Sequence, residues 1–193
     1  TKAAASGKAA SYAVSGGALT ISVPGGSCGS CGVTDGSRFA PQVAPFSGDF
    51  EMVLSLAELS RTAFPGSRDH SGVRLYYGTQ SWIGLLGNYS HVRLPDGTTA
   101  GHRVIGYGNG GAPCFFDNSL STSVLYAMDL RIRRTGTASY MGYRLQGDTQ
   151  WRESACPLEA SGGANIDVVS GDGGGTSQNG AESLKFERFK ITA

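Results

Sequence analysis

The chain has few charged residues, little net charge and no long apolar run. Charged residues make up 16% of its 193 residues, and the formal net charge is +1. Soluble domains average about 25% charged residues, and a nearly balanced chain has no strong field to attract nucleic acid or an anionic membrane. No stretch approaches the roughly 20 apolar residues of a membrane-spanning helix. We therefore expect neither nucleic acid nor a membrane as a partner.

The N-terminal segment lacks the apolar run of a signal peptide. Residues 1–13 are rich in Ala, Ser and Lys, which predicts a processed or trimmed N-terminus. The length fits one ordinary domain, and we find no internal repeat and no linker. We predict a flexible tail over residues 1–11 and a single domain over residues 12–193.

Sequence patterns of common catalytic sites are also missing. The three histidines, His70, His91 and His102, have no metal-ligand spacing, and no Gly-x-Ser-x-Gly precedes a helix. Glycoside hydrolysis needs two carboxyl groups about 5 to 10 Å apart, yet Glu51 and Glu58 are seven positions apart. Pairs such as Asp167 with Asp172, or Asp69 with Asp96, would depend on the fold alone. An enzyme is therefore the less favoured interpretation.

Glycine and short alternating runs are abundant. Glycine accounts for 30 residues, and β-rich runs bounded by Gly, Pro, Asn and Asp recur along the chain, which is typical of a sandwich or barrel. The clearest predicted strands are 18–23, 48–56, 72–77, 82–86, 102–107, 126–134, 139–145, 164–170 and 183–192. One helical turn is predicted over 57–62, and 108–118 and 171–180 are predicted to be irregular loops.

Alternation also assigns the faces of the strands. Val73, Leu75 and Tyr77 are predicted to point inward, which leaves Arg74 and Tyr76 on the opposite face. The inward sets of the two later strands are Met128, Leu130 and Ile132, and Met141, Tyr143 and Leu145. Their outward neighbours are Asp129, Arg131, Arg133, Tyr140 and Arg144.

The four cysteines, Cys28, Cys31, Cys114 and Cys156, lie in Gly-, Ser- and Pro-rich segments. An even number in turn-like segments favours two disulfides and an oxidising, extracellular compartment. Three pairings satisfy this count, and proximity favours Cys28 with Cys31 and Cys114 with Cys156. The Cys28-x-x-Cys31 spacing also occurs in zinc and redox sites, but no second ligand pair follows it and its glycines disfavour a helix.

Seven strand-and-turn stretches, taken in order, resemble the concanavalin A-like lectin/glucanase superfamily, particularly small modules at the C-terminus of some β-xylosidases. The stretches are 12–21 (YAVSGGALTI), 48–51 (GDFE), 70–75 (HSGVRL), 82–85 (WIGL), 130–134 (LRIRR), 147–151 (GDTQW) and 186–191 (FERFKI). The resemblance implies an all-β, two-sheet antiparallel jelly-roll sandwich, often with a carbohydrate site on a concave face. The closely spaced catalytic carboxylates of the family's glucanases and the motifs of its alginate lyases are absent.

Two surfaces are candidates for binding a sugar, which needs an aromatic ring beside polar groups. Ile83 and Leu85 are predicted to point inward, so Trp82 should project to the face that carries Arg74 and Tyr76. The first candidate set is Arg74, Tyr76, Trp82, Asn88 and Tyr89. The second is Arg131, Arg133, Tyr140 and Arg144. The alternative for Trp82 is packing under a loop or on the convex face, and the resemblance implies that Trp151 packs in the core.

A structural calcium ion is the one metal that the sequence favours, mostly through the resemblance. Asp167 and Asp172, with Asn165, lie near a glycine-rich loop and offer oxygen ligands. No cofactor is required by the leading hypothesis, a secreted non-catalytic carbohydrate-binding, lectin-like module. The alternatives are a structural or adhesive subunit of an extracellular assembly, which would bind protein or self-associate, and a glycoside hydrolase or polysaccharide lyase.

Overall fold

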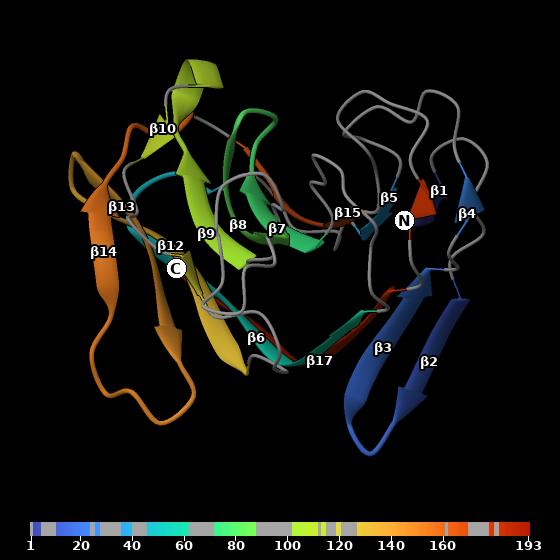
Figure 1. Cartoon of the computed structure of the whole chain (residues 1–193). Helices are drawn as coiled ribbons and strands as arrows, with labels where there is room; N and C mark the ends of the chain where they lie inside the picture. Colours follow the sequence, from blue (N-terminus) through green and yellow to red (C-terminus); the bar gives the residue numbers. More distant parts are fainter. Residues whose placement is uncertain are drawn as a thin grey trace.

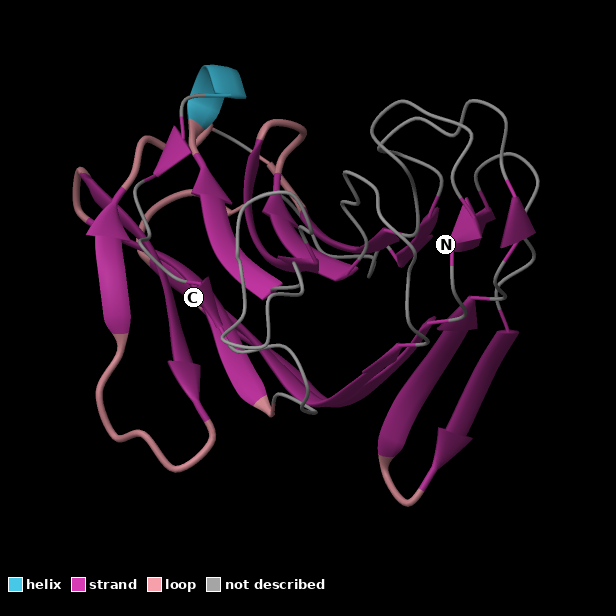
Figure 2. Cartoon of the chain, in the orientation of Figure 1, coloured by secondary structure: helices cyan, strands magenta, loops and turns pink. Residues whose placement is uncertain are grey.

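The protein is a sandwich of two antiparallel β-sheets, seen in a computed structural model (Figure 1). The structure describes residues 2–4, 11–23, 26–27, 36–39, 46–61, 72–87, 102–111, 113–114, 119–120, 127–160, 162–169, 178–179 and 182–193. Strands dominate these residues, and η1 (Asn109–Gly111) is the one short helical turn among them (Figure 2). No described helix has the length and apolar character to cross a bilayer.

The first layer is an eight-stranded sheet. Its order is β1 (Lys2–Ala4), β5 (Gly36–Phe39), β15 (Ala164–Val169), β7 (Gly72–Tyr77), β8 (Ser81–Gly87), β9 (His102–Tyr107) and β10 (Pro113–Cys114), and β11 (Ser119–Leu120) also pairs with β9. Strand β1 lies within the stretch predicted as a tail. The consecutive strands β7, β8 and β9 are direct neighbours, so side chains close in sequence meet across this sheet.

The second layer is a seven-stranded sheet. Its order is β14 (Arg152–Ala155), β13 (Ala138–Leu145), β12 (Met128–Thr135), β6 (Phe50–Arg61), β17 (Glu182–Thr192), β3 (Ala18–Val23) and β2 (Ser11–Ser15). A small third sheet pairs β4 (Gly26–Ser27) with β16 (Gln178–Asn179). Figure 1 shows β6, β17 and β3 in one layer and β7, β8 and β9 in the other.

The core lies between the two sheets and confirms the predicted faces. Fully or almost fully buried side chains come from both layers: Met52, Leu54, Leu56, Val73, Leu75, Tyr77, Ile83, Leu85, Met128, Leu130, Ile132, Met141, Tyr143, Leu184 and Phe186. Leu145 packs partly buried against them. Each large apolar side chain contributes about 1.5–3 kcal/mol when buried. The two-residue alternation of side chains along each strand therefore determines which residues each sheet presents to solvent.

The predicted helical turn over residues 57–62 is wrong for the residues that the structure describes. Residues 57–61 continue β6, and Glu58 lies opposite Lys185 of β17. Ala, Glu and Leu favour a helix, but pairing with β17 outweighs this weak local preference. The predicted loop over 108–118 contains η1 and β10, and only 178–179 of the other predicted loop, 171–180, are described.

A disulfide joins the edges of the two sheets. Cys114 in β10 bonds to Cys156, which follows β14, with a Cα–Cα distance of 5.7 Å. This confirms one of the two predicted pairings. Cys28 and Cys31 lie outside the described residues.

Candidate functional site

Three aromatic side chains form a row across the outer face of the eight-stranded sheet. Tyr76 of β7 lies opposite Trp82 of β8, and Trp82 lies opposite Tyr107 of β9. Their strand neighbours Leu75 and Ile83 are buried in the core, so the row faces away from it. We call Tyr76, Trp82 and Tyr107 the aromatic row.

The rings of the aromatic row are in contact with one another. The centroids of Tyr76 and Trp82 are 6.1 Å apart, and those of Trp82 and Tyr107 are 4.7 Å apart with an interplanar angle of 28°. Tyr76 is only 7% exposed, whereas Trp82 and Tyr107 are half-buried. The row is therefore a preformed apolar strip that is open mainly at Trp82 and Tyr107.

Arg74 lies across this strip. Its guanidinium carbon is 4.5 Å from the centroid of the Trp82 ring, and its Nη1 donates to the hydroxyl of Tyr76 at 3.2 Å. The side chain is only 6% exposed, and its Nε has no hydrogen-bond partner. Among the side chains that the structure describes, no carboxylate forms an ion pair with Arg74. Among the described side chains, the guanidinium of Arg74 thus contacts the ring of Trp82 and the hydroxyl of Tyr76, and no carboxylate.

Gly84 makes the position of Arg74 attainable. It lies opposite Arg74 in the β7–β8 pairing, on the same outer face. A Cβ at this position would approach the carbonyl oxygen of Val73 to 2.6 Å and Cγ of Arg74 to 2.9 Å. Any side chain here would displace Arg74 from the ring of Trp82.

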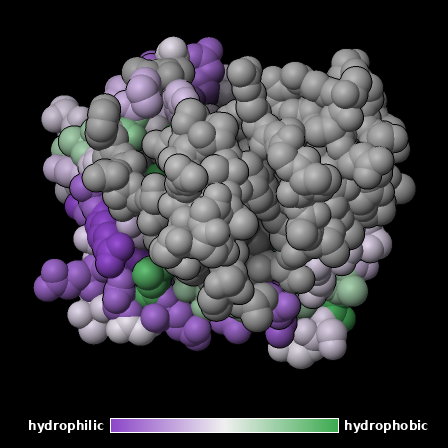
Figure 3. Space-filling model, in the orientation of Figure 1, coloured by the Kyte–Doolittle hydropathy of each residue, from purple (hydrophilic) through white to green (hydrophobic). Residues whose placement is uncertain are grey.

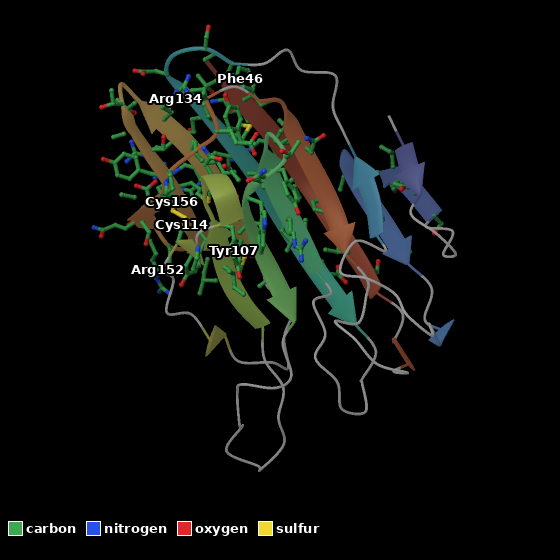
Figure 4. The ribbon with its side chains drawn as sticks, turned by 90° about the horizontal axis from the view of Figure 1, so that it is seen from above. Phe46, Tyr107, Cys114, Arg134, Arg152 and Cys156 are labelled. Carbon is green, nitrogen blue, oxygen red and sulfur yellow. A yellow bond between two sulfur atoms is a disulfide. The ribbon has the colours of Figure 1, made fainter. Side chains whose placement is uncertain are left out.

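The aromatic row ends in a polar residue on one side and in the disulfide-linked strand on the other. Asn165 of β15 lies opposite Tyr76 and is half-buried. Pro113 of β10 lies opposite Tyr107, and the next residue, Cys114, is bonded to Cys156. Figure 4 shows Tyr107 beside this disulfide. The covalent bond therefore fixes the strand next to Tyr107.

A carboxylate holds the turn that joins β7 and β8. Glu159 accepts hydrogen bonds from the backbone amides of Thr79, at 2.8 Å, and Gln80, and the side-chain oxygen of Gln80 accepts from the amide of Gly110 at 3.0 Å. A Cβ on Gly78, whose φ is 72°, would collide with Glu159. Glu159 thereby holds the turn next to Tyr76 and Trp82, and Gln80 links this turn to Gly110. No sequence signal links Glu159 to this turn, and we did not predict it.

The second predicted surface lies on the outer face of the seven-stranded sheet, and its arginines are paired. Arg131 contacts Glu51 at 3.1 Å and Glu153 at 2.6 Å, and Arg133 contacts Glu153 at 3.1 Å. Arg144 contacts Asp129 at 2.6 Å. The alternation predicted that these arginines face outward, but not that β14 supplies Glu153. Figure 3 shows hydrophilic residues along the side where β13 and β14 lie.

The aromatic residues of this face lie against the arginines. Arg133 lies 4.2 Å from the ring centroid of Tyr140. Trp151 has Arg131 at 3.8 Å and Arg144 at 4.7 Å from its ring centroid, and it is half-buried. The expectation that Trp151 packs in the core is therefore wrong, because this ring covers the outward arginines.

The charge network keeps Glu153 ionised. Burial raises the pKa of its carboxyl, but hydrogen bonds from Arg133 and Arg131 outweigh burial and lower the pKa below its ordinary value. The hydrogen bond to Glu153 raises the pKa of Arg133 in turn. Such a carboxylate is suited to holding arginines and poorly suited to donating a proton.

The remaining predicted site residues are only partly described. Asn88, Tyr89 and Asp172 lie outside the described residues, as do His70 and His91. Asp167 belongs to β15, where its backbone lies opposite Arg74 on one side and Arg38 on the other. Among the described residues there is no group of three potential metal ligands. The calcium site at Asp167 and Asp172 stays a prediction.

Sequence comparison finds no matching family model and no similar curated protein. The structure is similar to a functionally unknown protein from Saccharomyces cerevisiae, with a TM-score of 0.57 and 11% identity over 95% of this chain and 91% of that one. The exoplasmic/lumenal domain of VIP36, in a Ca²⁺/Man-bound form, matches with a TM-score of 0.50 and 10% identity, over 97% and 88%.

A xylan β-1,4-xylosidase from Bacillus halodurans C-125 matches with a TM-score of 0.49 and 14% identity. The match covers 90% of this chain and 33% of the enzyme, so the chain spans about a third of its length. At these identities the similarities to the yeast protein and to VIP36, with TM-scores of 0.57 and 0.50, show the fold alone and confirm the predicted sandwich. The protein has the two-sheet antiparallel fold of the concanavalin A-like lectins.

Proposed function

We propose that this domain is a non-catalytic, extracellular carbohydrate-binding module, with the aromatic row and Arg74 as its binding surface. The observation that carries the proposal is the register that aligns Tyr76, Trp82 and Tyr107 on three adjacent strands. The predicted candidates Asn88 and Tyr89 follow β8 in sequence and belong to the same proposal.

The chemistry of this face fits a sugar better than an ion. Aromatic rings offer an apolar surface to the C–H face of a pyranose, and neighbouring polar groups hydrogen-bond its hydroxyls. Here the guanidinium of Arg74 and the side chain of Asn165 stand beside the rings. No described carboxylate side chain forms an ion pair with Arg74, which supports a role for its donors in binding sugar hydroxyls.

The two carboxylates that contact Arg131 favour a structural role over hydrolysis. A glycosidase needs one carboxyl group whose pKa is raised so that it can protonate the leaving group. Glu51 and Glu153 are the acids brought together through Arg131, and the pKa of Glu153 is lowered. These two carboxylates therefore act in the charge network of the seven-stranded sheet.

The disulfide supports an extracellular or lumenal location. Cys114 and Cys156 are both buried, and disulfides persist in oxidising compartments. The fold of VIP36 in its Ca²⁺/Man-bound form supports the choice of ligand class. The proposal requires no cofactor.

Trp82→Ala, compared with wild type on a glycan array and in polysaccharide pull-downs, tests the proposal. Circular dichroism first establishes that both proteins fold. We expect at least a tenfold loss of affinity, about the contribution of one stacked ring. Trp151→Ala is the matched control, because it removes the other tryptophan from the opposite sheet. Equal binding by wild type and Trp82→Ala would refute the proposed surface.

The exposed edge of the seven-stranded sheet favours a second candidate, a subunit of an extracellular assembly. Strand β2 is the last strand of this sheet, and its Val14 is 78% exposed. An open edge strand is a template for pairing with another chain. Concentration-dependent dimerisation in analytical ultracentrifugation, abolished by Val14→Lys, would support this candidate over glycan binding.

A further inference from the structure

A groove opens on the outer face of the seven-stranded sheet, on the side of the molecule opposite the aromatic row. Its volume is about 590 Å³, within the range of small-molecule sites. Backbone and side chains of β6, β12, β13, β17 and the turn after β13 line it. The groove belongs neither to the aromatic row nor to the ion pairs around Glu153.

Strand register places four polar side chains in one line across the groove. Arg144 lies opposite Asp129, Asp129 opposite Ser55, and Ser55 opposite Arg188. All four line the groove. The line runs through β13, β12, β6 and β17, so a rigid sheet holds every one of these groups.

A β-bulge adds a carboxylate to this line. The pairing of β17 with β6 shifts between Phe186 and Arg188, which leaves Glu187 without a partner residue. Bulges redirect side chains and are frequent beside functional sites. Glu187 and Arg188 both line the groove and are both exposed, and neither forms an ion pair with a described residue. An acceptor and a donor thus stand next to each other, and neither is paired with another described residue.

The floor of the groove carries a buried hydroxyl without a partner. Ser55 is 9% exposed, and its Oγ has no hydrogen-bond partner. Leaving a buried hydroxyl unsatisfied is costly, which points to a group that arrives from outside the chain. Beside it, both bonds from Arg144 go to Oδ2 of Asp129, at 2.7 and 2.6 Å, and no described residue donates to Oδ1.

We propose that this groove is a second ligand site, and that its ligand is an uncharged sugar residue. The lining holds two arginines and three carboxylates, those of Asp129, Asp148 and Glu187, so no strong charge of one sign selects an ion. Adjacent acceptors and donors match vicinal hydroxyl groups. Ala127 adds a small apolar surface beside these polar groups.

This second site does not depend on the aromatic row, because different strands and different residues build it. If both sites bind, they lie on opposite outer faces of one sandwich. A single domain would then bind two polysaccharide chains at once, or bind one chain at both sites with a higher overall affinity. The domain would act as a cross-link between glycan chains.

Titration with uncharged hexasaccharides of xylose, mannose and glucose, monitored through backbone amide chemical shifts, tests the site. We expect shifts at Ser55, Asp129 and Arg188 that persist in Trp82→Ala. We expect Arg188→Ala and Glu187→Ala each to raise the Kd obtained from these shifts by at least about tenfold, which is the effect of one lost charged hydrogen bond. Lys190→Ala is the matched control, since Lys190 is exposed on the same strand and lies outside the groove lining.

Ser55→Ala separates a ligand contact from a structural role. Because its hydroxyl has no partner, the variant should keep the wild-type melting temperature and still bind sugar several-fold more weakly. A drop in melting temperature with unchanged affinity would overturn the proposal. The proposal would also be overturned if only a galacturonic acid hexamer shifted the groove residues, or if no sugar did. An equal loss of affinity in Lys190→Ala would overturn it as well. If the sugars shifted the groove residues but not Trp82, the result would instead count against the aromatic row.

Discussion

The two outer faces of the sandwich use the same residue types in opposite ways. On the seven-stranded sheet, Arg131, Arg133 and Arg144 each contact a carboxylate. On the eight-stranded sheet, Arg74 is more buried than any of these, yet its described contacts are a ring and a phenol hydroxyl. Carboxylates hold the three guanidinium groups of the seven-stranded sheet, whereas no described carboxylate holds that of Arg74.

The two tryptophans repeat this difference. Trp151 lies between Arg131 and Arg144, so the charge network occupies its ring. Trp82 lies among other rings in a row that crosses three strands. The comparison teaches that composition alone does not separate a binding site from a structural network of ion pairs. What separates them is whether the polar groups already have partners, and mutation can test this.

The largest expected effect comes from removing the covalent link between the two sheets. Replacing Cys114 and Cys156 with Ala should lower the free energy of unfolding by about 4 kcal/mol, because the bond closes a loop over a sequence separation of 42. Urea unfolding measures this loss. Replacing Cys28 and Cys31 with Ala is the control, since the predicted bond between cysteines three positions apart would close too short a loop to constrain the unfolded chain much. A loss below about 1 kcal/mol would show that packing alone joins the sheets.

The next effect should come from Glu153 on the seven-stranded sheet. Glu153→Ala leaves Arg133 without its carboxylate and Arg131 with Glu51 alone, so we expect a loss of about 2 kcal/mol in the free energy of unfolding. Urea unfolding again provides the measurement. Glu58→Ala is the matched control, because Glu58 has no ion pair with a described residue, and we expect a change within about 0.5 kcal/mol. Equal losses in the two variants would mean that the network adds nothing.

The pH dependence of stability provides a smaller and independent test of the same network. The pKa of Glu153 is lower in the folded protein than its ordinary value of 4.5. Its contribution to stability is therefore fully present above pH 4.5 and is lost as the pH falls through the folded pKa. The stability gap between wild type and Glu153→Gln should narrow when unfolding is measured from pH 6 down to pH 3. A gap that is constant over this range would contradict an ionised, paired Glu153.

Much of this arrangement could be predicted from the sequence, because local alternation determines which face a side chain occupies. The inward positions of Val73, Leu75 and Ile83, and the outward positions of Arg74 and Trp82, follow from a period of two. The order of strand-and-turn stretches resembled a superfamily with the two-sheet fold that the structure shows. The pairing of Cys114 with Cys156 was favoured by proximity and is confirmed.

The rest depends on contacts between residues far apart in the chain. Tyr107 joins Trp82 only through the register of β8 with β9, and Glu153 reaches Arg131 only because β14 lies beside β13. Alternation places a residue on a face but does not determine which residues become neighbours on it. Trp151 was misplaced for this reason, since its position depends on Arg131 and Arg144. The bulge at Glu187 likewise arises from pairing between β17 and β6.

Replacing Arg74 should have the smallest effect on stability, and it is the clearest test of the difference between the two outer faces. Arg74→Met keeps an unbranched apolar side chain at this position, and it removes the guanidinium that lies over Trp82 and has no described counter-ion. We expect the free energy of unfolding to change by less than about 1 kcal/mol, whereas affinity for a glycan bound at the aromatic row should fall about tenfold. Arg131→Met, which leaves Glu51 without its cation, should lower the free energy of unfolding and leave the affinity for a glycan at the aromatic row unchanged. If Arg74→Met instead destabilises the protein and leaves binding intact, Arg74 is a structural residue and the contrast between the faces is wrong.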